Sequence, residues 1–221
     1  MIRLIHKNEN VVTVHLKEKE LKSYKGVSCV SAIHDLAINY PDELLIWCEE
    51  IYKNNIAWNK VLELFHHKRI MSSYSFTEYY LSSSIGYVED SPFLKVSKKV
   101  QFPTWQMSSD IGGVFLEVLL KFPQQFWKTI NFSYFLNSIG KIGQKQGILC
   151  YSNPNLLNTD VKPKGIIKKK INNPTLFKFV KQHYKTRWVF LLFLNLFIYE
   201  KKTPCFSLLS ILFIKNRFNY N

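Results

Sequence analysis

The sequence has few cysteines, and their spacing argues against several kinds of site. Cys29, Cys48, Cys150 and Cys205 are far apart, and no two form a Cys-x-x-Cys motif. This spacing disfavours a zinc knuckle or a thiol redox site. Each cysteine falls in an apolar run, so we expect free thiols that pack as small hydrophobic side chains in a reducing, cytoplasmic setting.

Long apolar runs are also missing. The first ten residues contain no apolar core of signal-peptide length. The longest apolar run spans residues 188–199 and stops at Glu200-Lys201-Lys202, which is too short for a standard transmembrane helix. The sequence therefore predicts neither translocation nor a membrane span.

Acidic residues are scarce in the last third of the chain. Residues 158–221 carry 13 Lys and Arg against Asp160 and Glu200, which supplies +11 of the formal net charge of +14. The first 157 residues are nearly balanced, with 17 basic and 14 acidic side chains. An AT-rich genome would enrich Lys but would not explain this asymmetry. A basic segment that runs into an apolar one is typical of proteins that sit on an anionic bilayer.

The predicted membrane-contact residues lie on a helix expected from Thr175 to Tyr199, which begins after Asn173-Pro174. Cations on this helix alternate with aromatic side chains, as in an interfacial helix with snorkelling lysines. Two alternatives are nucleic-acid binding, with aromatic rings stacked on bases, and simple packing on the rest of the protein. The apolar run favours lipid or a partner helix over nucleic acid. The expected membrane contacts are Lys178, Lys181, Lys185, Arg187, Trp188, Phe190, Phe193 and Phe197.

The first 157 residues alternate between strand and helix patterns, which indicates an α/β sheet. Strands are expected at 11–16, 43–48, 68–76, 85–88, 93–96 and 147–151, and helices at 26–39, 59–65, 113–122 and 132–146. Residues 158–173 read as a basic linker, and 174–221 as a helical segment with a second apolar piece at 206–214. The expected organisation is an α/β domain at 1–157, the linker, and a membrane-associating helical appendage.

The segment 108–113 carries a motif that is typical of phosphate-binding turns. Ser109 and Asp110 precede Gly112 and Gly113 at the expected start of a helix. Backbone amides at a helix start bind phosphate, and glycine lets the chain approach a ligand closely. We therefore take Ser109, Gly112 and Gly113 as candidate phosphate-binding residues; the alternative is plain helix capping.

Glu89 and Asp90 follow a short apolar stretch. Adjacent carboxylates at a strand end are suited to a divalent metal bound to a diphosphate. The alternative is an ordinary acidic turn before Pro92. No Asp-x-Asp triplet occurs in the chain.

Three segments together resemble the closing part of the nucleotide-sugar domain of family 2 glycosyltransferases. They are Gly112-Gly113-Val114-Phe115, the run from Asn131 to Leu136, and the run from Gly147 to Pro154. Residues 102–110, followed by the basic-apolar helix, are similar to N-terminal portions of two-module bacterial glycosyltransferases. The chain departs from the family because it lacks the proline-threonine-x-asparagine signature for the uridine nucleotide as well as Asp-x-Asp.

The resemblance implies a Rossmann-like, GT-A-like mixed sheet with flanking helices. It also implies a glycosyltransferase-like role in polysaccharide or glycolipid assembly, peripheral to the inner face of the plasma membrane. In an active enzyme, Glu89 and Asp90 would hold Mn²⁺ or Mg²⁺ on a nucleotide-sugar donor, and Asp110 would be the base that deprotonates the acceptor.

The two departures favour a degenerate or accessory domain, which would work with a downstream catalytic module or a partner glycosyltransferase. A non-catalytic module that tethers a partner to the membrane and a basic nucleic-acid-binding protein are the alternatives from other functional classes.

Overall fold

The structure is a computed structural model that describes residues 1–76, 79–81, 83–89, 96–158 and 171–201. The chain divides into two compact units. Unit 1 comprises residues 1–79 and 97–167, and unit 2 comprises residues 80–96 and 168–221. The segment 80–96 thus belongs with the C-terminal helices and not with the sheet that precedes and follows it in sequence.

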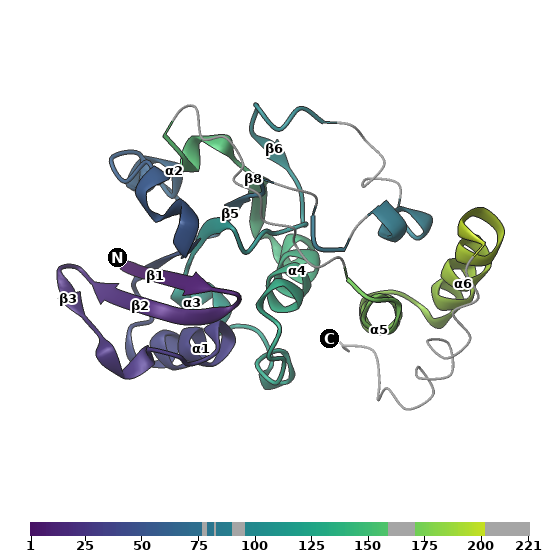
Figure 1. Ribbon diagram of the computed structural model, residues 1–221, viewed down its shortest axis with the longest axis horizontal. Helices are drawn as coiled ribbons and strands as arrows, with labels where there is room; N and C mark the ends of the chain where they lie inside the picture. The colour runs from purple at the N-terminus through teal and green to yellow at the C-terminus, as the bar shows by residue number, and fades with distance from the viewer. Residues whose placement is uncertain (77–78, 82, 90–95, 159–170, 202–221) are drawn as a thin grey trace. The chain divides into compact units, whose positions relative to one another are not determined.

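Unit 1 is an α/β unit built on a mixed eight-stranded sheet with the order β3-β2-β1-β4-β7-β5-β8-β6 (Figure 1). Strands β1 and β4 are parallel, as are β5 and β8, whereas β7 lies antiparallel between β4 and β5. The strands are β1 (Ile2–Lys7), β2 (Asn10–Leu16), β3 (Lys19–Glu20), β4 (Leu44–Glu49), β5 (Ile70–Tyr74), β6 (Phe102–Pro103), β7 (Ile111–Phe115) and β8 (Leu149–Ser152). The expected α/β mixed sheet with flanking helices is confirmed.

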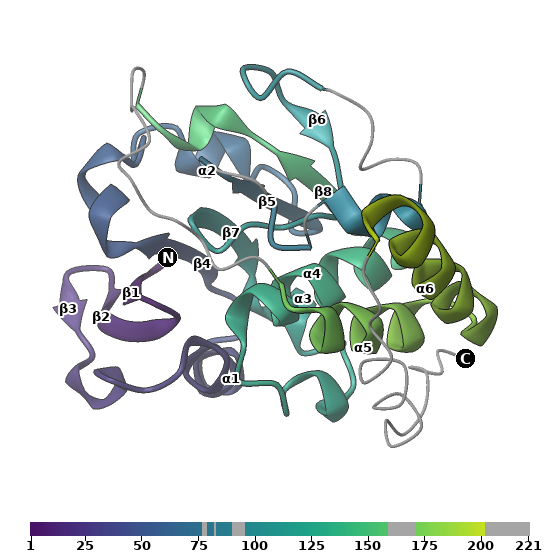
Figure 2. The ribbon, with the colours of Figure 1, turned by 45° about the vertical axis from the view of Figure 1, so that its right-hand side comes forward.

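Helices flank both faces of this sheet. In Figure 2, α1, α3 and α4 lie below the sheet and α2 lies above it. The helices of unit 1 are α1 (Cys29–Asn39), α2 (Val61–Leu64), α3 (Leu116–Leu119) and α4 (Phe132–Gly143); short 3₁₀ helices include η2 (Glu50–Asn55), η6 (Gln144–Gln146) and η7 (Pro154–Leu156). Helix α1 begins where the Ser28 hydroxyl accepts a hydrogen bond from the Ser31 amide, as expected for an N-cap.

Alternate side chains of β4 pack into the hydrophobic cores on the two faces of the sheet. Ile46 and Cys48 pack with Val61 of α2 and Leu156 of η7, while the fully buried Trp47 contacts Phe132 of α4 edge to face. A strand buried on both faces is expected to read as a continuous apolar run, and this is how residues 43–48 were identified.

The helix predicted at 113–122 is wrong in its first half. Residues 111–115 form the central strand β7, and only Leu116–Leu119 are helical. The glycines explain the difference, because a Cβ on Gly112 would lie 2.3 Å from Trp47 Cζ2 and one on Gly113 would lie 2.4 Å from Ile46 Cδ1. The glycine pair makes room for large side chains of β4.

Other differences are smaller. Strand β1 was not predicted, so the strand at 11–16 is the second and not the first. Residues 83–87 form the 3₁₀ helix η3 (Ser83–Tyr87) and not a strand. The strand expected at 93–96 and the apolar piece at 206–214 lie wholly or mostly outside the described residues, as does most of the linker at 158–173.

The described part of unit 2 consists of η3 and two helices, α5 (Asn173–His183) and α6 (Thr186–Glu200). The single helix expected from Thr175 to Tyr199 is therefore wrong, because Tyr184 is extended and ends α5. The helix start is confirmed: the Asn172 side chain accepts a hydrogen bond from the Thr175 amide, and proline lies in the first turn. Among the described helices, none has the length and apolarity needed to cross a membrane.

Candidate site at the carboxyl edge of the sheet

Polar side chains gather at one edge of the sheet in unit 1. The parallel strands β1, β4, β5 and β8 end at this edge, and the antiparallel β7 begins there. Ligands of open α/β sheets bind outside the carboxyl ends of the strands. A ligand site of this sheet is therefore expected at this edge.

His6 lies between the ends of β1 and β4 at this edge, next to the chain that precedes β7. Its side chain is fully buried, and Nε2 donates to the Ser109 carbonyl at 2.8 Å. The other nitrogen, Nδ1, lies 3.0 Å from Glu49 Oε2. His6 and Glu49 are also cross-strand partners of β1 and β4. The Nε2 hydrogen bond therefore joins the end of β1 to the chain that enters β7, and Nδ1 faces the Glu49 carboxylate at the end of β4.

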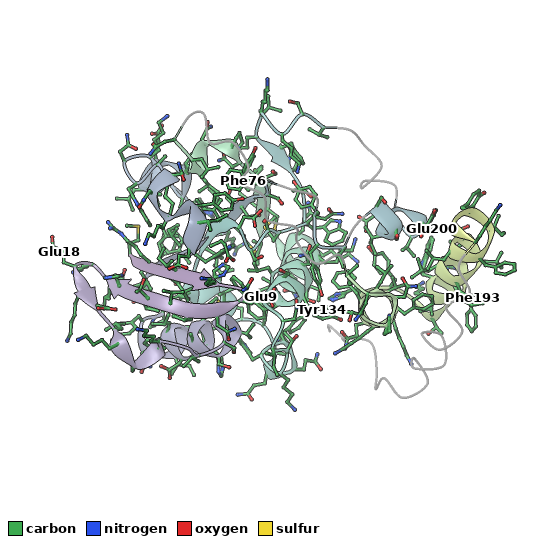
Figure 3. All side chains as sticks on the ribbon, in the orientation of Figure 1. Glu9, Glu18, Phe76, Tyr134, Phe193 and Glu200 are labelled. Carbon is green, nitrogen blue, oxygen red and sulfur yellow. The ribbon has the colours of Figure 1, made fainter. Side chains whose placement is uncertain are left out.

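Glu9 occupies the N-terminus of α4. Its carboxylate accepts hydrogen bonds from the backbone amides of Phe132 and Ser133 at 3.0 Å each and from the Ser133 hydroxyl at 2.8 Å. The Asn131 side chain caps a further amide, that of Tyr134. Figure 3 labels Glu9 and Tyr134 at this end of α4. An anion from the protein itself thus fills the position where a helix N-terminus would bind phosphate.

Asp110, the predicted catalytic base, is only 2% exposed. Its Oδ2 accepts hydrogen bonds from the Phe76 amide at 3.0 Å and from the Ser75 hydroxyl at 3.3 Å, and its carbonyl accepts from the Glu49 amide at 2.8 Å. A buried carboxylate held by backbone and hydroxyl donors joins the end of β5 to the start of β7. This arrangement favours a structural role for Asp110.

The predicted phosphate-binding residues do not lie at a helix start. Gly112 and Gly113 pair with both β4 and β5 in the centre of the sheet. The Ser109 hydroxyl lies 3.1 Å from that of Ser133, and Ser109 is 5% exposed. The premise of the prediction, free amides at the start of a helix, is absent at these three residues.

The predicted metal ligands belong to unit 2 or lie outside the described residues. The Glu89 carboxylate accepts a hydrogen bond from the Tyr184 hydroxyl. Burial, reinforced by the charge of Glu89, raises the pKa of Tyr184 well above its ordinary value, so this hydroxyl stays a donor. Asp90 lies outside the described residues. Within the part of the chain that the structure describes, no three His, Cys, Asp or Glu side chains cluster as a metal site, so the metal at Glu89 and Asp90 stays a prediction.

Sequence reasoning missed a second carboxylate pair at the carboxyl edge. Glu49 is the last residue of the buried strand β4 and Glu50 follows it, which is the same signal that drew attention to Glu89 and Asp90. Glu49 contacts His6, and Glu50 lies 3.6 Å from the Lys7 ammonium. Both partners, His6 and Lys7, belong to β1. This strand was not predicted, so nothing in the sequence indicated that the two glutamates lie at the sheet edge.

The three described cysteines are free and buried. Burial raises the pKa of Cys150 to about 12 and raises the pKa of Cys29 and Cys48 as well. Such thiols stay protonated and are poor nucleophiles, which confirms the expectation that these residues pack as small hydrophobic groups. Cys205 lies outside the described residues.

The predicted membrane contacts fall on α5 and α6 of unit 2. Lys185, Arg187, Phe190 and Phe197 are exposed, whereas Lys178, Lys181, Trp188 and Phe193 are half-buried. Helix α6 buries Val189, Leu192 and Leu196 and exposes apolar residues elsewhere on its surface. These exposed residues are Phe190, Leu191, Leu194, Phe197, Ile198 and Tyr199.

Comparison of the chain with protein-family models, with curated proteins and with solved structures finds no match.

Proposed function

We propose that this chain is a glycosyltransferase-like accessory protein that sits on the cytoplasmic face of the membrane and takes part in polysaccharide or glycolipid assembly. Its partner would be a downstream catalytic module or a separate glycosyltransferase that uses the nucleotide-sugar donor. The α/β unit would be the GT-A-like domain that the sequence resemblance implies, and the helices of unit 2 would be the membrane-associating appendage. The observation that carries the membrane part of the proposal is the exposed apolar face of α6.

That face is a continuous stripe. At about 3.6 residues per turn, Arg187, Phe190, Leu191, Leu194, Phe197 and Ile198 fall on one side of α6. The buried Val189, Leu192 and Leu196 fall on the opposite side. Exposed cations stand at both ends of the helix, with Lys185 and Arg187 at its start and Lys201 at its end. An apolar stripe flanked by cations suits the boundary between anionic headgroups and acyl chains.

Three features of the carboxyl edge support an accessory role over catalysis. Asp110 is buried and accepts hydrogen bonds from Ser75 and Phe76. The N-terminus of α4 is occupied by Glu9. Glu49 and Glu50 each face a basic side chain of β1. Groups of the protein itself thus already contact these carboxylates and the amides at the start of α4.

Co-sedimentation of the full chain with lipid vesicles tests the membrane proposal. We expect binding to vesicles that contain phosphatidylglycerol and little binding to phosphatidylcholine alone, with each cation near the surface contributing about 1 kcal/mol. Changing Lys178, Lys181, Lys185 and Arg187 to Gln should weaken binding strongly, and so should added salt. A matched variant with Lys22, Lys25, Lys121 and Lys145 of unit 1 changed to Gln controls for net charge.

A separate experiment tests the accessory role. Addition of UDP-sugars with Mn²⁺ should leave the thermal unfolding of the isolated chain unchanged, and no sugar should be released. Thermal stabilisation that requires the metal, followed by turnover, would show that the chain is itself an enzyme.

A further inference from the structure

A basic pocket lies away from the carboxyl edge, on the sheet face that α2 covers. It has a volume of about 650 Å³ and is formed by β1, β2, the turn after β2, η2 and Trp58. This volume falls within the range of pockets that hold small-molecule ligands. All of its residues belong to unit 1.

The lining of the pocket is rich in cations. Arg3 and His15 are direct cross-strand partners of β1 and β2, so their side chains stand next to each other on the same face. Lys17 comes from the turn after β2, and Lys53 comes from η2. One acid, Glu18, also lines the pocket, which leaves a formal charge of +2 from three permanent cations and one carboxylate. Figure 3 shows Glu18 at the outer end of the hairpin.

The cations of this pocket differ from other basic residues of unit 1 in their ion pairing. Within the described residues, no carboxylate forms an ion pair with Arg3, Lys17 or Lys53, whereas Lys7 pairs with Glu50 and Lys68 pairs with Asp42 and Glu117. Arg3 is half-buried and lies near His15, Lys17 and Lys53. Among the described residues it has no protein counter-ion, so an anionic ligand can supply one.

A ring contact orients one of these cations, and another lies on an unusual backbone. The Arg3 guanidinium lies over the Trp58 ring, 4.3 Å from its centroid, which orients the planar fork. Lys17 has a φ of +56° in the turn between β2 and β3. Backbone of this kind favours glycine or asparagine and costs a lysine stability. The turn nevertheless carries a long cationic side chain that lines the pocket.

We propose that this pocket binds a phosphate-bearing small molecule. A guanidinium donates two parallel hydrogen bonds to phosphate oxygens, and the lysines contribute point charges to the same group or to a second phosphate. The site lies on the face of the sheet and not at its carboxyl edge. The proposal therefore goes beyond the accessory and membrane roles and does not depend on either of them.

Calorimetric titration of the full chain with sodium pyrophosphate, at low and at physiological salt, tests the proposal. We expect saturable binding that weakens as salt rises. Arg3→Gln should weaken binding at least about tenfold, and Arg3→Lys should recover part of the loss. Lys17→Gln and Lys53→Gln should each weaken binding by about three- to tenfold. Both lysines are exposed, so these two variants keep the test valid if Arg3→Gln fails to fold. The control, Lys145→Gln in η6, should change binding less than about twofold.

A second titrant, glycerol 3-phosphate, identifies the source of the phosphate. Binding comparable to that of pyrophosphate would point to a single phosphate ester, such as a lipid headgroup, and selective binding of pyrophosphate would point to a soluble diphosphate. The proposal is overturned if neither titrant binds saturably at millimolar concentration, or if Lys145→Gln weakens binding as much as the pocket variants do.

Discussion

Asp110 shows how the position of a residue in the fold decides its role. In the sequence Asp110 precedes a glycine pair, and the family resemblance makes it the candidate catalytic base. In the structure its carboxylate is buried and takes hydrogen bonds from the Phe76 amide and the Ser75 hydroxyl. A carboxylate in this position has few ways to reach a substrate, and it ties β5 to β7.

We therefore predict that Asp110→Ala lowers the free energy of unfolding by about 2–3 kcal/mol, because it leaves buried donors without their acceptor. Asp110→Asn retains an acceptor oxygen and should cost at most about half as much. Urea unfolding measures both values. Equal losses for the two variants, or no loss for either, would show that these hydrogen bonds are not what Asp110 contributes.

The buried thiols lead to a prediction about pH. Burial raises the pKa of Cys150 from 9.0 to about 12, so the folded state prefers the protonated thiol. This contribution to stability is complete below pH 9 and is lost as the pH rises from about 9 towards 12, at about 1.4 kcal/mol per pH unit. Urea midpoints at pH 7.5, 9 and 10.5 should therefore fall more steeply for the native chain than for Cys150→Ala. The same dependence of the urea midpoint on pH in both proteins would contradict a raised pKa for Cys150.

Helices and strands were predicted best where one local apolar pattern determines the secondary structure. The apolar spacing after Ser28 identified α1, the apolar run at 43–48 identified β4, and the run from Phe132 identified α4. Strand β1 was missed because Arg3 and His6 interrupt its apolar residues. Only the pairing with β2 and β4 shows that His6 is buried and that Arg3 lines a pocket.

Long-range packing accounts for the remaining errors. The spacing of Val114, Leu116 and Leu119 is compatible with a helix, but the side chains of β4 require glycines opposite them and place 111–115 in the sheet. The break between α5 and α6 follows Tyr184, whose hydroxyl binds Glu89 almost a hundred residues earlier in the chain. Long-range packing also decided the candidate site. Its residues Glu49 and Glu50 lie next to β1, the strand that was not predicted.

The two sides of α6 should respond differently to substitution. Leu192 is fully buried, so Leu192→Ala should lower the free energy of unfolding by about 2–5 kcal/mol. Leu194 is 51% exposed, so Leu194→Ser should change stability by no more than about 0.5–1 kcal/mol but weaken binding to anionic vesicles. Leu62→Ser in α2, at a position that is 70% exposed, controls for the loss of an exposed apolar side chain. Weaker vesicle binding by the Leu62 variant as well would contradict a specific role for α6.

At the scale of the whole molecule, the strands and the α-helices of unit 1 all lie before residue 159. A chain that ends at Asn158 should therefore fold alone. We expect it to be soluble, to unfold cooperatively in urea and to lose vesicle binding. Residues 83–89 should become easily cleaved by protease, because Ser84 and Glu89 lose Glu200 and Tyr184 as hydrogen-bond partners. A molten or aggregated product would mean that the C-terminal helices belong to the core of the α/β unit.

The membrane proposal places the exposed face of α6 in the bilayer. A nitroxide label at Leu194→Cys, in a Cys205→Ser background, tests it directly, because the other three cysteines are buried and weakly reactive. A label at Ile130→Cys, which is 80% exposed in unit 1, serves as the reference. On anionic vesicles, the label at 194 should become accessible to oxygen and protected from a water-soluble nickel complex, while the label at 130 stays in water. A label at 194 that remains as accessible to nickel as the one at 130 would contradict the account.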